Sequence, residues 1–336
     1  MKYNNLLDAI GNTPLVQLNF KSEARIFAKL EYLNPGGSMK DRSALYMIEE
    51  AERLGILKPG GTIIDASSGN HGVAVAMIGK IKGYKVIICV FEKCSNEKLQ
   101  TIKSYGAQVI VCPNTSLISD PKGYHSVALE LHKNTPNSFM PNQYFNITNA
   151  IGHEMSMGPE IWKQTEGTVT HFFAAAGTGG TISGVGRYLK KQNPNVKVIA
   201  IDSNHSFRAT NGNPKPYKIE GIGMDFDTPV LDKDVIDDIV EVSDENGLGM
   251  LKTLSAEHGF LVGPSSGAVA WAAYSYISKL KPTDVAVIMF GDSGRAYLSK
   301  GFYDYEEVTK AEIVLEKPAI EEIEIHMPAK ETQINL

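Results

Sequence analysis

The sequence contains few cysteines and lacks the common metal-binding patterns built from them. Its three cysteines, Cys89, Cys94 and Cys112, are too few to form a disulfide framework in a chain of 336 residues. No CxxC pair and no HExxH pattern occurs among them and the 8 histidines, so no metal site is predicted. Cys89 and Cys112 lie in apolar, strand-like runs, where buried and unreactive thiols are usual. We therefore expect a reduced, cytoplasmic protein.

Long hydrophobic runs and an excess of basic residues are also missing. No apolar run approaches the roughly 20 residues that a membrane-spanning helix needs. Residues 1–15 lack the continuous apolar core and the small-residue cleavage site of a signal peptide. The formal net charge of −5 argues against a nucleic acid bound through a basic face. We therefore expect neither a membrane nor a nucleic acid as a partner.

Short β-branched runs alternate with helical patterns along most of the chain, which is long enough for about two domains. The predicted strands are Ile26–Leu30, Thr62–Ala66, Val86–Glu92, Gln108–Cys112, Phe172–Ala176, Val196–Asp202, Ile236–Val242, Phe260–Val262 and Val285–Phe290. The predicted helices are Asp41–Leu54, His71–Ile81, Asn96–Tyr105, Ser126–Lys133, Ile151–Gln164, Ile182–Lys191, Glu245–His258 and Ser266–Lys279. Many strands are apolar on both faces, which predicts parallel α/β sheets covered by helices on both sides.

Two segments interrupt this alternation. Residues 134–149 contain Pro136, Pro141 and several asparagines, and this run is the best boundary between two sheets. Residues 306–336 are charged and carry two prolines, with an alternating stretch at Ile320–Met327. We interpret this C-terminal tail either as a strand laid on a partner subunit or as a mobile segment.

A glycine-rich turn at residues 34–42 delivers one lysine, Lys40, to the start of a predicted helix. Glycines allow positive φ angles and the close approach of a ligand. The positive end of the helix dipole would lower the pKa of a nearby amine. An amine of lowered pKa is what Schiff-base chemistry requires, although a lysine after two glycines can also be an ordinary surface residue.

Two further loops join a strand to a helix and carry unusual polar chemistry. Residues 67–72 (SSGNHG) combine hydroxyls, an amide and the free N–H groups of a new helix, which suit a carboxylate or simply cap the helix. Residues 177–181 (GTGGT) form a nest of N–H donors suited to one phosphate group, unless they form only a tight turn. A dinucleotide fingerprint would require glycine where Ile182 stands.

A fourth loop, residues 263–267 (GPSSG), opens another predicted helix with hydroxyl groups. One hydroxyl there can bond a ring nitrogen, while the helix dipole disfavours protonation of that nitrogen; simple N-capping is the alternative. Ligands of open α/β sheets bind beyond the carboxyl ends of the strands, where these four loops would meet. A reactive lysine, a phosphate nest, a carboxylate cradle and a ring-nitrogen hydroxyl together describe a pyridoxal 5′-phosphate site.

At these residues the sequence resembles the fold-type II pyridoxal-phosphate enzymes, specifically the cysteine synthase and cystathionine β-synthase family. The similar motifs are NPGGSMKDR, SSGNHG, GTGGTISG and GPSSGA, and the resemblance runs from about Leu6 to Tyr303. It implies two three-layer α/β/α domains like those of the tryptophan synthase β-subunit, with the active site in the cleft between them. It also implies a smaller mobile domain at residues 41–150, a cofactor-binding domain at 1–40 with 151–305, a tail at 306–336, and a homodimer.

The resemblance also assigns roles to individual residues. It implies that Lys40 is the Schiff-base lysine and the general acid/base, that Asn70 bonds the 3′-oxygen of the cofactor, and that Ser265 bonds the ring nitrogen. The residues implied to bind the phosphate are Gly177, Thr178, Gly179, Gly180 and Thr181. The residues implied to hold the α-carboxylate of the substrate are Ser67, Ser68, Asn70, His71 and Gln143. The loop at Gly221 and Gly223 resembles the one that faces the bound amino acid.

The implied reaction is β-replacement on O-acetylserine or serine with a thiol, sulfide or homocysteine, giving cysteine or cystathionine. Two departures from the family pattern are His71, where threonine is usual, and Met224, where the cystathionine β-synthase branch often has tyrosine. The loop SSGNH is also similar to that of serine and threonine dehydratases, so β-elimination is an alternative, as is cysteine desulfhydration. Residues 27–42 resemble members that use an amine nucleophile to make diaminopropionate precursors. A binding module without turnover is disfavoured because Lys40 is intact.

Overall fold

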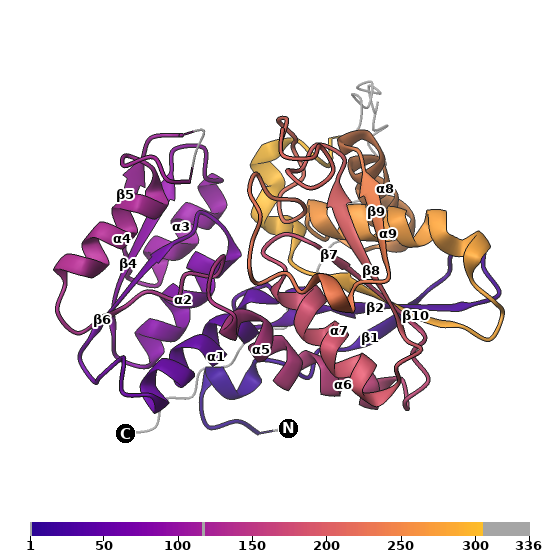
Figure 1. The fold of residues 1–336 in the computed structure, drawn as a ribbon, viewed down its shortest axis with the longest axis horizontal. Helices are drawn as coiled ribbons and strands as arrows, with labels where there is room; N and C mark the ends of the chain where they lie inside the picture. The colour runs from indigo at the N-terminus through magenta and orange to yellow at the C-terminus, as the bar shows by residue number, and fades with distance from the viewer. Residues whose placement is uncertain (1, 116–117, 305–336) are drawn as a thin grey trace, which may run out of the picture. The chain divides into compact units, whose positions relative to one another are not determined.

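Two β-sheets organise the computed structural model, which describes residues 2–115 and 118–304 (Figure 1). The six-stranded sheet has the order β1-β2-β10-β7-β8-β9, and the four-stranded sheet has the order β5-β4-β3-β6. Every pair of neighbouring strands is parallel except β1 with β2. The larger sheet contains β1 (Leu15–Leu18), β2 (Arg25–Leu30), β7 (His171–Ala175), β8 (Lys197–Ser203), β9 (Asp238–Val242) and β10 (Val285–Phe290). The smaller sheet contains β3 (Thr62–Ala66), β4 (Lys85–Phe91), β5 (Gln108–Cys112) and β6 (Ser138–Phe139).

Helices cover both faces of each sheet. Around the smaller sheet lie α1 (Lys40–Arg53), α2 (Asn70–Ile81), α3 (Asn96–Ser104) and α4 (Tyr124–Asn134). With the larger sheet pack α5 (Thr148–Met155), α6 (Met157–Gln164), α7 (Gly180–Gln192), α8 (Asp244–His258) and α9 (Pro264–Tyr276). Short 3-10 helices complete the described elements: η1 (Leu6–Ala9), η2 (Glu31–Leu33), η3 (Lys233–Val235), η4 (Ile277–Lys279) and η5 (Gly294–Lys300).

The core of the larger sheet follows the two-residue period of its strands. In β8, Ile199 and Ile201 pack in the cluster that contains Val269 of α9. The intervening residues Val198 and Ala200 pack on the opposite face with α6 and α7. Because successive side chains point to opposite faces, a strand covered on both sides must be apolar throughout. The smaller sheet repeats the arrangement, with α2 on one face and α4 on the other. The predicted three-layer α/β architecture is therefore confirmed.

Most predicted elements form close to their predicted bounds, and three strands, β3, β5 and β10, match them fully. Two predictions are wrong. Phe260–Val262 is not a strand, because only Val262 forms an isolated bridge, with Ser293. The helix predicted at Ile151–Gln164 is two helices that meet at Ser156. Pro159 explains the break, since a proline lacks an N–H and fits only the first turn of a new helix.

Two short strands were not predicted. β1 pairs antiparallel with β2, and β6 adds only two residues to the smaller sheet. The segment 134–149, predicted as a boundary, contains β6 and so still belongs to the smaller sheet at its start. The tail at 306–336 lies outside the described residues, and the proposed domain bounds stay a prediction. None of the described helices is both long enough and apolar enough to cross a membrane.

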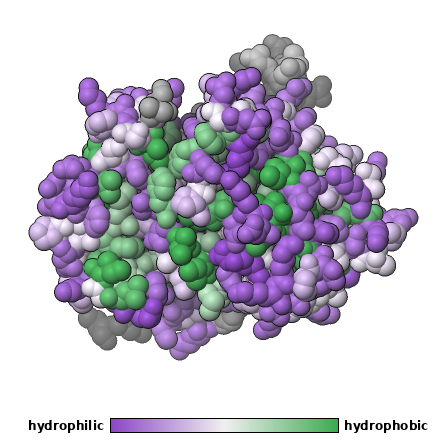
Figure 2. All heavy atoms as spheres, viewed as in Figure 1, coloured by the Kyte–Doolittle hydropathy of each residue, from purple (hydrophilic) through white to green (hydrophobic). Residues whose placement is uncertain are grey.

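Hydrophilic side chains cover most of the surface seen in Figure 2, and hydrophobic groups appear there in separate places. Three large apolar side chains are well exposed on or just before α5: Phe145 at 41%, Ile147 at 60% and Met155 at 65%. All three cysteines are free thiols, and Cys89 and Cys112 are buried. Burial raises the pKa of the Cys89 thiol to about 12, which keeps it unreactive at neutral pH.

Candidate active site

Three of the four loops singled out in the sequence come together through a chain of short contacts. Met39 donates its N–H to the carbonyl of Gly291 (2.8 Å), directly after β10. A Cβ added at Gly291 would lie 3.3 Å from Met39 Sδ and 3.9 Å from Ser265 Oγ. A Cβ at Gly221 would lie 3.2 Å from that of Ser265, and one at Gly177 would lie 2.8 Å from Gly221 O. The lysine, phosphate and ring-nitrogen loops therefore border one another.

Lys40 is the first residue of α1, whose start has no side-chain cap. Its ammonium forms no hydrogen bond or ion pair with any residue of the described chain. Burial lowers the pKa of Lys40 to about 8, and the charge of Asp292 opposes this effect. A lysine with a lowered pKa and no partner can supply the neutral amine that attacks an aldehyde.

The phosphate loop is shaped by its glycines. Gly179 caps α7 with φ of 88°, a left-handed conformation, and an added Cβ would lie 2.6 Å from Leu231 Cα. Gly179 gives α7 no side-chain cap, and Gly180 donates its N–H to Thr178 Oγ1 at 3.4 Å. Within the described chain the N–H groups of Thr181 and Ile182 have no acceptor. Such free N–H groups at a helix start favour an anion such as a phosphate group.

Both threonine hydroxyls of the phosphate loop are held by residues that the sequence did not point to. Thr178 Oγ1 accepts a hydrogen bond from Asn149 Nδ2 (3.1 Å). Thr181 Oγ1 lies 3.2 Å from Nε2 of the buried His153. Burial and the positive charges of Lys40 and Arg42 hold the pKa of His153 well below its usual value. His153 is therefore neutral at physiological pH.

The carboxylate loop starts directly after β3 and runs into α2. Its two serine hydroxyls already stabilise the loop, since Ser67 Oγ accepts from Gly72 N (3.1 Å) and Ser68 Oγ accepts from Phe91 N (2.8 Å). The first-turn N–H groups of Asn70 and His71 have no acceptor within the described residues. The donors that this loop offers to a carboxylate are therefore mainly backbone N–H groups.

The side chain of His71 does not face the other loops. It is 1% exposed, and its Nδ1 lies 2.8 Å from the buried carboxylate of Asp65 in β3. Its Nε2 is buried without a hydrogen-bond partner. The predicted contact of His71 with the substrate stays a prediction, and its backbone N–H is the group placed to make it.

Two amide side chains belong to the carboxylate loop or contact it: Asn70 lies in the loop, and Gln143 bonds Ser67. Gln143 is 5% exposed, and its Nε2 donates to Ser67 Oγ at 3.5 Å. Its Oε1 is buried without a partner, which is costly unless a ligand or water bonds it. Asn70 donates from Nδ2 to the carboxylate of Asp292 (2.6 Å). Because an amide NH₂ has two hydrogens, Asn70 keeps a second donor for a ligand oxygen.

Asp292 and Tyr297 were missed in the sequence. Asp292 is the second residue after β10, and its backbone pairs with Ser38, two residues before Lys40. The hydroxyl of Tyr297 donates to Asp292 Oδ2 (2.5 Å). The rule that ligands bind beyond the carboxyl ends of parallel strands points to Asp292, because β10 lies at the centre of its sheet.

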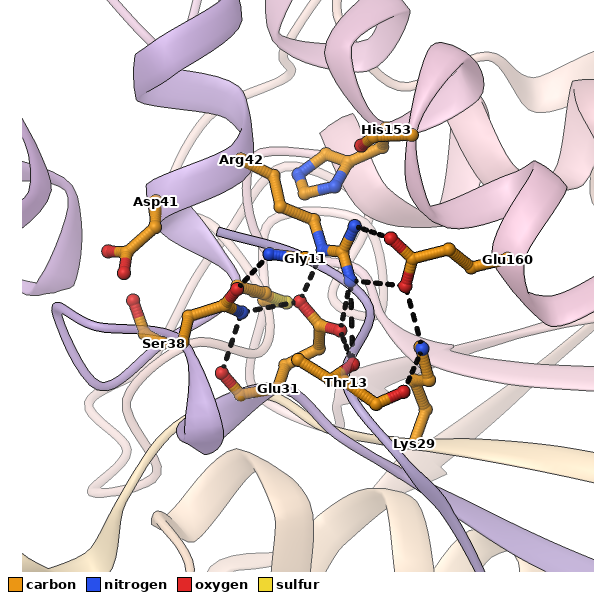
Figure 3. Close-up of polar contacts among 12 residues, drawn as sticks. Gly11, Thr13, Lys29, Glu31, Ser38, Asp41, Arg42, His153 and Glu160 are labelled. Atoms are coloured by element: carbon orange, nitrogen blue, oxygen red, sulfur yellow. Dashed lines mark hydrogen bonds and ion pairs between the residues drawn. The ribbon is translucent and has the colours of Figure 1, made fainter. Parts of the chain in front are cut away.

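A buried network of charges fixes the base of this region (Figure 3). Arg42, on the first turn of α1, bonds Glu31 of η2 through Nε (2.7 Å) and Glu160 of α6 through Nη1 (2.7 Å). Lys29 of β2 donates to Glu160 (2.9 Å) and to the backbone oxygen of Thr13. The network ties α1, which carries Lys40, to the larger sheet and to α6.

The residues present fit pyridoxal 5′-phosphate. The unpartnered Lys40 amine suits its aldehyde, and the uncapped start of α7 suits its phosphate. The hydroxyl of Ser265, 8% exposed at the start of α9, has no hydrogen-bond partner in the described chain and suits a ring nitrogen. Among the described residues, no group of His, Cys, Asp or Glu side chains is placed to hold a metal ion.

Comparison with known proteins gives consistent matches. A family model described as "Pyridoxal-phosphate dependent enzyme" matches residues 6–292. Cystathionine beta-synthase of Apis mellifera is 42% identical over 310 residues, which are 90% of this chain and 62% of the bee protein. Cysteine synthase of Staphylococcus aureus is 39% identical over 308 residues, covering 90% of this chain and 98% of that protein. The chain thus spans less than two thirds of the bee protein.

The fold has a close match among solved structures. The crystal structure of the O-acetylserine dependent cystathionine beta-synthase from Helicobacter pylori superposes with a TM-score of 0.85 at 36% sequence identity. The match covers 90% of this chain and all of that one.

Proposed function

Because the chain belongs to the pyridoxal-phosphate dependent enzymes, we propose that it catalyses β-replacement on O-acetylserine or serine. Pyridoxal 5′-phosphate is its cofactor. The nucleophile of the proposed reaction is a thiol, sulfide or homocysteine, and the product is cysteine or cystathionine. The observation that carries this proposal is the meeting of an unpartnered Lys40 with a phosphate nest and a carboxylate loop.

In this proposal each loop has one task. When bound, the cofactor supplies an electron-withdrawing ring that makes the α-hydrogen of an attached amino acid acidic. Lys40 Nζ takes that proton, acetate or water leaves Cβ, and the nucleophile takes its place. The N–H groups at the start of α2, with Gln143, hold the α-carboxylate. The hydroxyl of Ser265 donates one hydrogen bond to the ring nitrogen, which stays unprotonated and uncharged.

Two alternatives use the same site. β-Elimination releases pyruvate and ammonia, as in serine or threonine dehydration or cysteine desulfhydration. An amine nucleophile in place of the thiol gives a diaminopropionate precursor, which the resemblance of residues 27–42 also allows. The proposal includes a homodimer, as the family resemblance implies, and a cytoplasmic location, as the low number of cysteines indicates.

The purified protein, loaded with cofactor, should be incubated with O-acetylserine or serine and with sulfide, homocysteine or glutamate. We expect a thioether or thiol amino acid, identified by mass, and borohydride reduction that attaches the cofactor to the Lys40 peptide. Lys40→Ala should abolish both results. If pyruvate and ammonia were the sole products with every acceptor, the reaction would be β-elimination and the proposed β-replacement would be wrong. A product formed only with glutamate would identify the amine reaction.

A further inference from the structure

Asp292 is a buried carboxylate to which the proposed reaction gives no task. It is 3% exposed and lies at the carboxyl end of β10, in the same region as Lys40. Backbone contacts hold it there, since Gly263 donates its N–H to the Asp292 carbonyl (2.9 Å) and Ser38 bridges to it. Burying a carboxylate costs free energy unless hydrogen bonds or a nearby positive charge stabilise it.

The carboxylate itself is held in one orientation. Its Oδ2 accepts hydrogen bonds from Tyr297 of η5 (2.5 Å) and from Asn70 of α2 (2.6 Å). Its Oδ1 is buried and accepts none, and it occupies the space that a Cβ added at Gly263 would need. Two donors on one oxygen favour the ionised form and fix the plane of the group, so no reorganisation is needed when a positive charge appears nearby.

Among the charged groups around Lys40, the carboxylate of Asp292 is the one that can balance its positive charge. Asp292 is the carboxylate whose charge acts on the Lys40 amine, at a distance beyond a direct ion pair. From α5, His153 faces Lys40 as a neutral ring, and Arg42 on α1 is neutralised by its own carboxylates. Burial raises the pKa of Asp292 above its ordinary value. The charge of Lys98 and the hydrogen bonds from Tyr297 and Asn70 oppose this rise, and the charge of Glu220 adds to it.

We propose that Asp292 is a positioning residue for Lys40: its fixed carboxylate stabilises the positive charge on Lys40 Nζ whenever that amine carries a proton. In the proposed reaction the α-proton of the substrate forms a new N–H bond with the Lys40 lone pair, and the electrons of the broken C–H bond stay with the substrate. A buried ammonium then appears, and Asp292 offsets its desolvation. The same carboxylate orients Asn70, so that its second N–H remains available.

This inference rests on the proposed function only for the source of the proton. The coupling of Asp292 to Lys40 is measurable in the full chain freed of cofactor, without any turnover. Acetylation of Lys40 by acetic anhydride, followed by peptide mass spectrometry across a pH series, gives the pH at which this amine loses its proton.

We expect Asp292→Asn to lower this acetylation midpoint by about one pH unit, because removal of a negative charge makes the ammonium less stable. The matched control is Asp65→Asn. Asp65 is also a buried carboxylate whose Oδ1 has no partner, but its Oδ2 bonds His71. Tyr297→Phe keeps the carboxylate but removes a donor, so a smaller shift in the same direction is expected. A wild-type midpoint in folded Asp292→Asn or Tyr297→Phe protein overturns the inference, and so does an equal shift in Asp65→Asn.

A second measurement uses the loaded enzyme and L-alanine, which has no leaving group. Exchange of its α-hydrogen in deuterated water, followed by NMR, reports the proton step alone, and Asp292→Asn should slow it about tenfold. Unchanged exchange in this variant overturns the proposed task of Asp292. A wild-type protein that exchanges nothing would refute the proposed function, whereas the acetylation result would still decide the coupling.

Discussion

The side chain of Lys40 combines two properties that rarely occur together. Its charge is poorly solvated, which brings the pKa to about 8, and it lacks a partner in the described chain. Desolvation favours the neutral amine that forms a bond with the cofactor, while Asp292 favours the protonated amine that exists after proton transfer. The two effects oppose each other, so the amine can hold or release a proton near neutral pH.

Gly179 is a residue of the phosphate loop at which substitution is strained in two ways. In Gly179→Ala the new Cβ would meet the backbone at Leu231 Cα (2.6 Å), and alanine would have to adopt a φ of 88°. We expect the variant to be less stable by about 1–3 kcal/mol and to bind pyridoxal phosphate more weakly. Thermal unfolding and an absorbance titration with the cofactor measure the two effects.

Gly249 provides the matched control for this variant. It is an exposed glycine inside α8, and an added Cβ there would meet nothing within 4 Å. Gly249→Ala should be neutral or stabilising by up to about 1 kcal/mol, with unchanged cofactor affinity. Equal affinities in Gly179→Ala and the wild type would show that the left-handed turn at the start of α7 does not shape the phosphate site.

The elements that carry the loops are joined through Glu160 and Arg42. Glu160 lies on α6 and accepts hydrogen bonds from Arg42 of α1, Lys29 of β2 and the backbone of Asn12. Burial alone would raise the pKa of Glu160, but the Arg42 hydrogen bonds and both positive charges hold it at about 2, below its ordinary value of 4.5. The ion pairs of Glu160 with Arg42 and Lys29 therefore require its carboxylate to be ionised.

This depressed pKa predicts how stability depends on pH. The stabilisation from Glu160 is fully present above pH 4.5 and is lost as pH falls through the folded-state pKa of about 2. Glu160→Gln should be less stable than the wild type by about 3 kcal/mol at neutral pH, because Arg42 and Lys29 lose a buried partner. The difference in unfolding free energy between Glu160→Gln and the wild type should become smaller as the pH is lowered below 4.5.

Urea unfolding across this pH range measures both curves. The control is Glu50→Gln, since Glu50 pairs with Arg53 on the surface of α1, where the arginine side chain is 67% exposed. It should leave the stability nearly unchanged. If the unfolding free energies of Glu160→Gln and the wild type differed by the same amount at every pH, the lowered pKa of Glu160 would be contradicted.

The two sheets, each with its own helices, also meet on the side of α3. Lys98 of α3 is 3% exposed, pairs with Glu220 Oε2 (2.7 Å) and lies 4.0 Å above the ring of Tyr297. Glu97 accepts two hydrogen bonds from Ser299 in η5, both at 2.7 Å. These contacts connect the helices of the smaller sheet with segments that follow β8 and β10.

We expect Lys98→Met to lower the free energy of unfolding by about 1–2 kcal/mol, because a desolvated cation–π contact and an ion pair are both lost. Lys279 is the control, since its amine also lies over a tyrosine, Tyr276 (4.2 Å), and near Asp238 (3.4 Å), but its side chain is 59% exposed. Lys279→Met should change stability by less than about 0.5 kcal/mol. Equal effects in urea unfolding would show that burial does not strengthen the Lys98 contacts.

The sequence alone was sufficient for the parallel α/β architecture and pointed to the loops of the candidate site. Buried parallel strands such as β10 are continuous apolar runs, and glycine-rich turns before helices carry their own backbone requirements, so both are visible locally. β1 and β6 were not predicted because they are only four and two residues long. They form strands by pairing with β2 and β3. The pairing of a short edge strand depends on partners that are distant in the chain.

The tertiary structure decided which groups face Lys40. Asp292 lies 252 positions after Lys40 in the sequence, and only the order of strands in the larger sheet brings its carboxylate to the loop of α1. The tertiary structure also decided the orientation of His71. This residue lies in a loop that favours ligand binding, but its ring bonds Asp65. Burial and side-chain direction follow from packing between distant segments, and these quantities set the charge of each group.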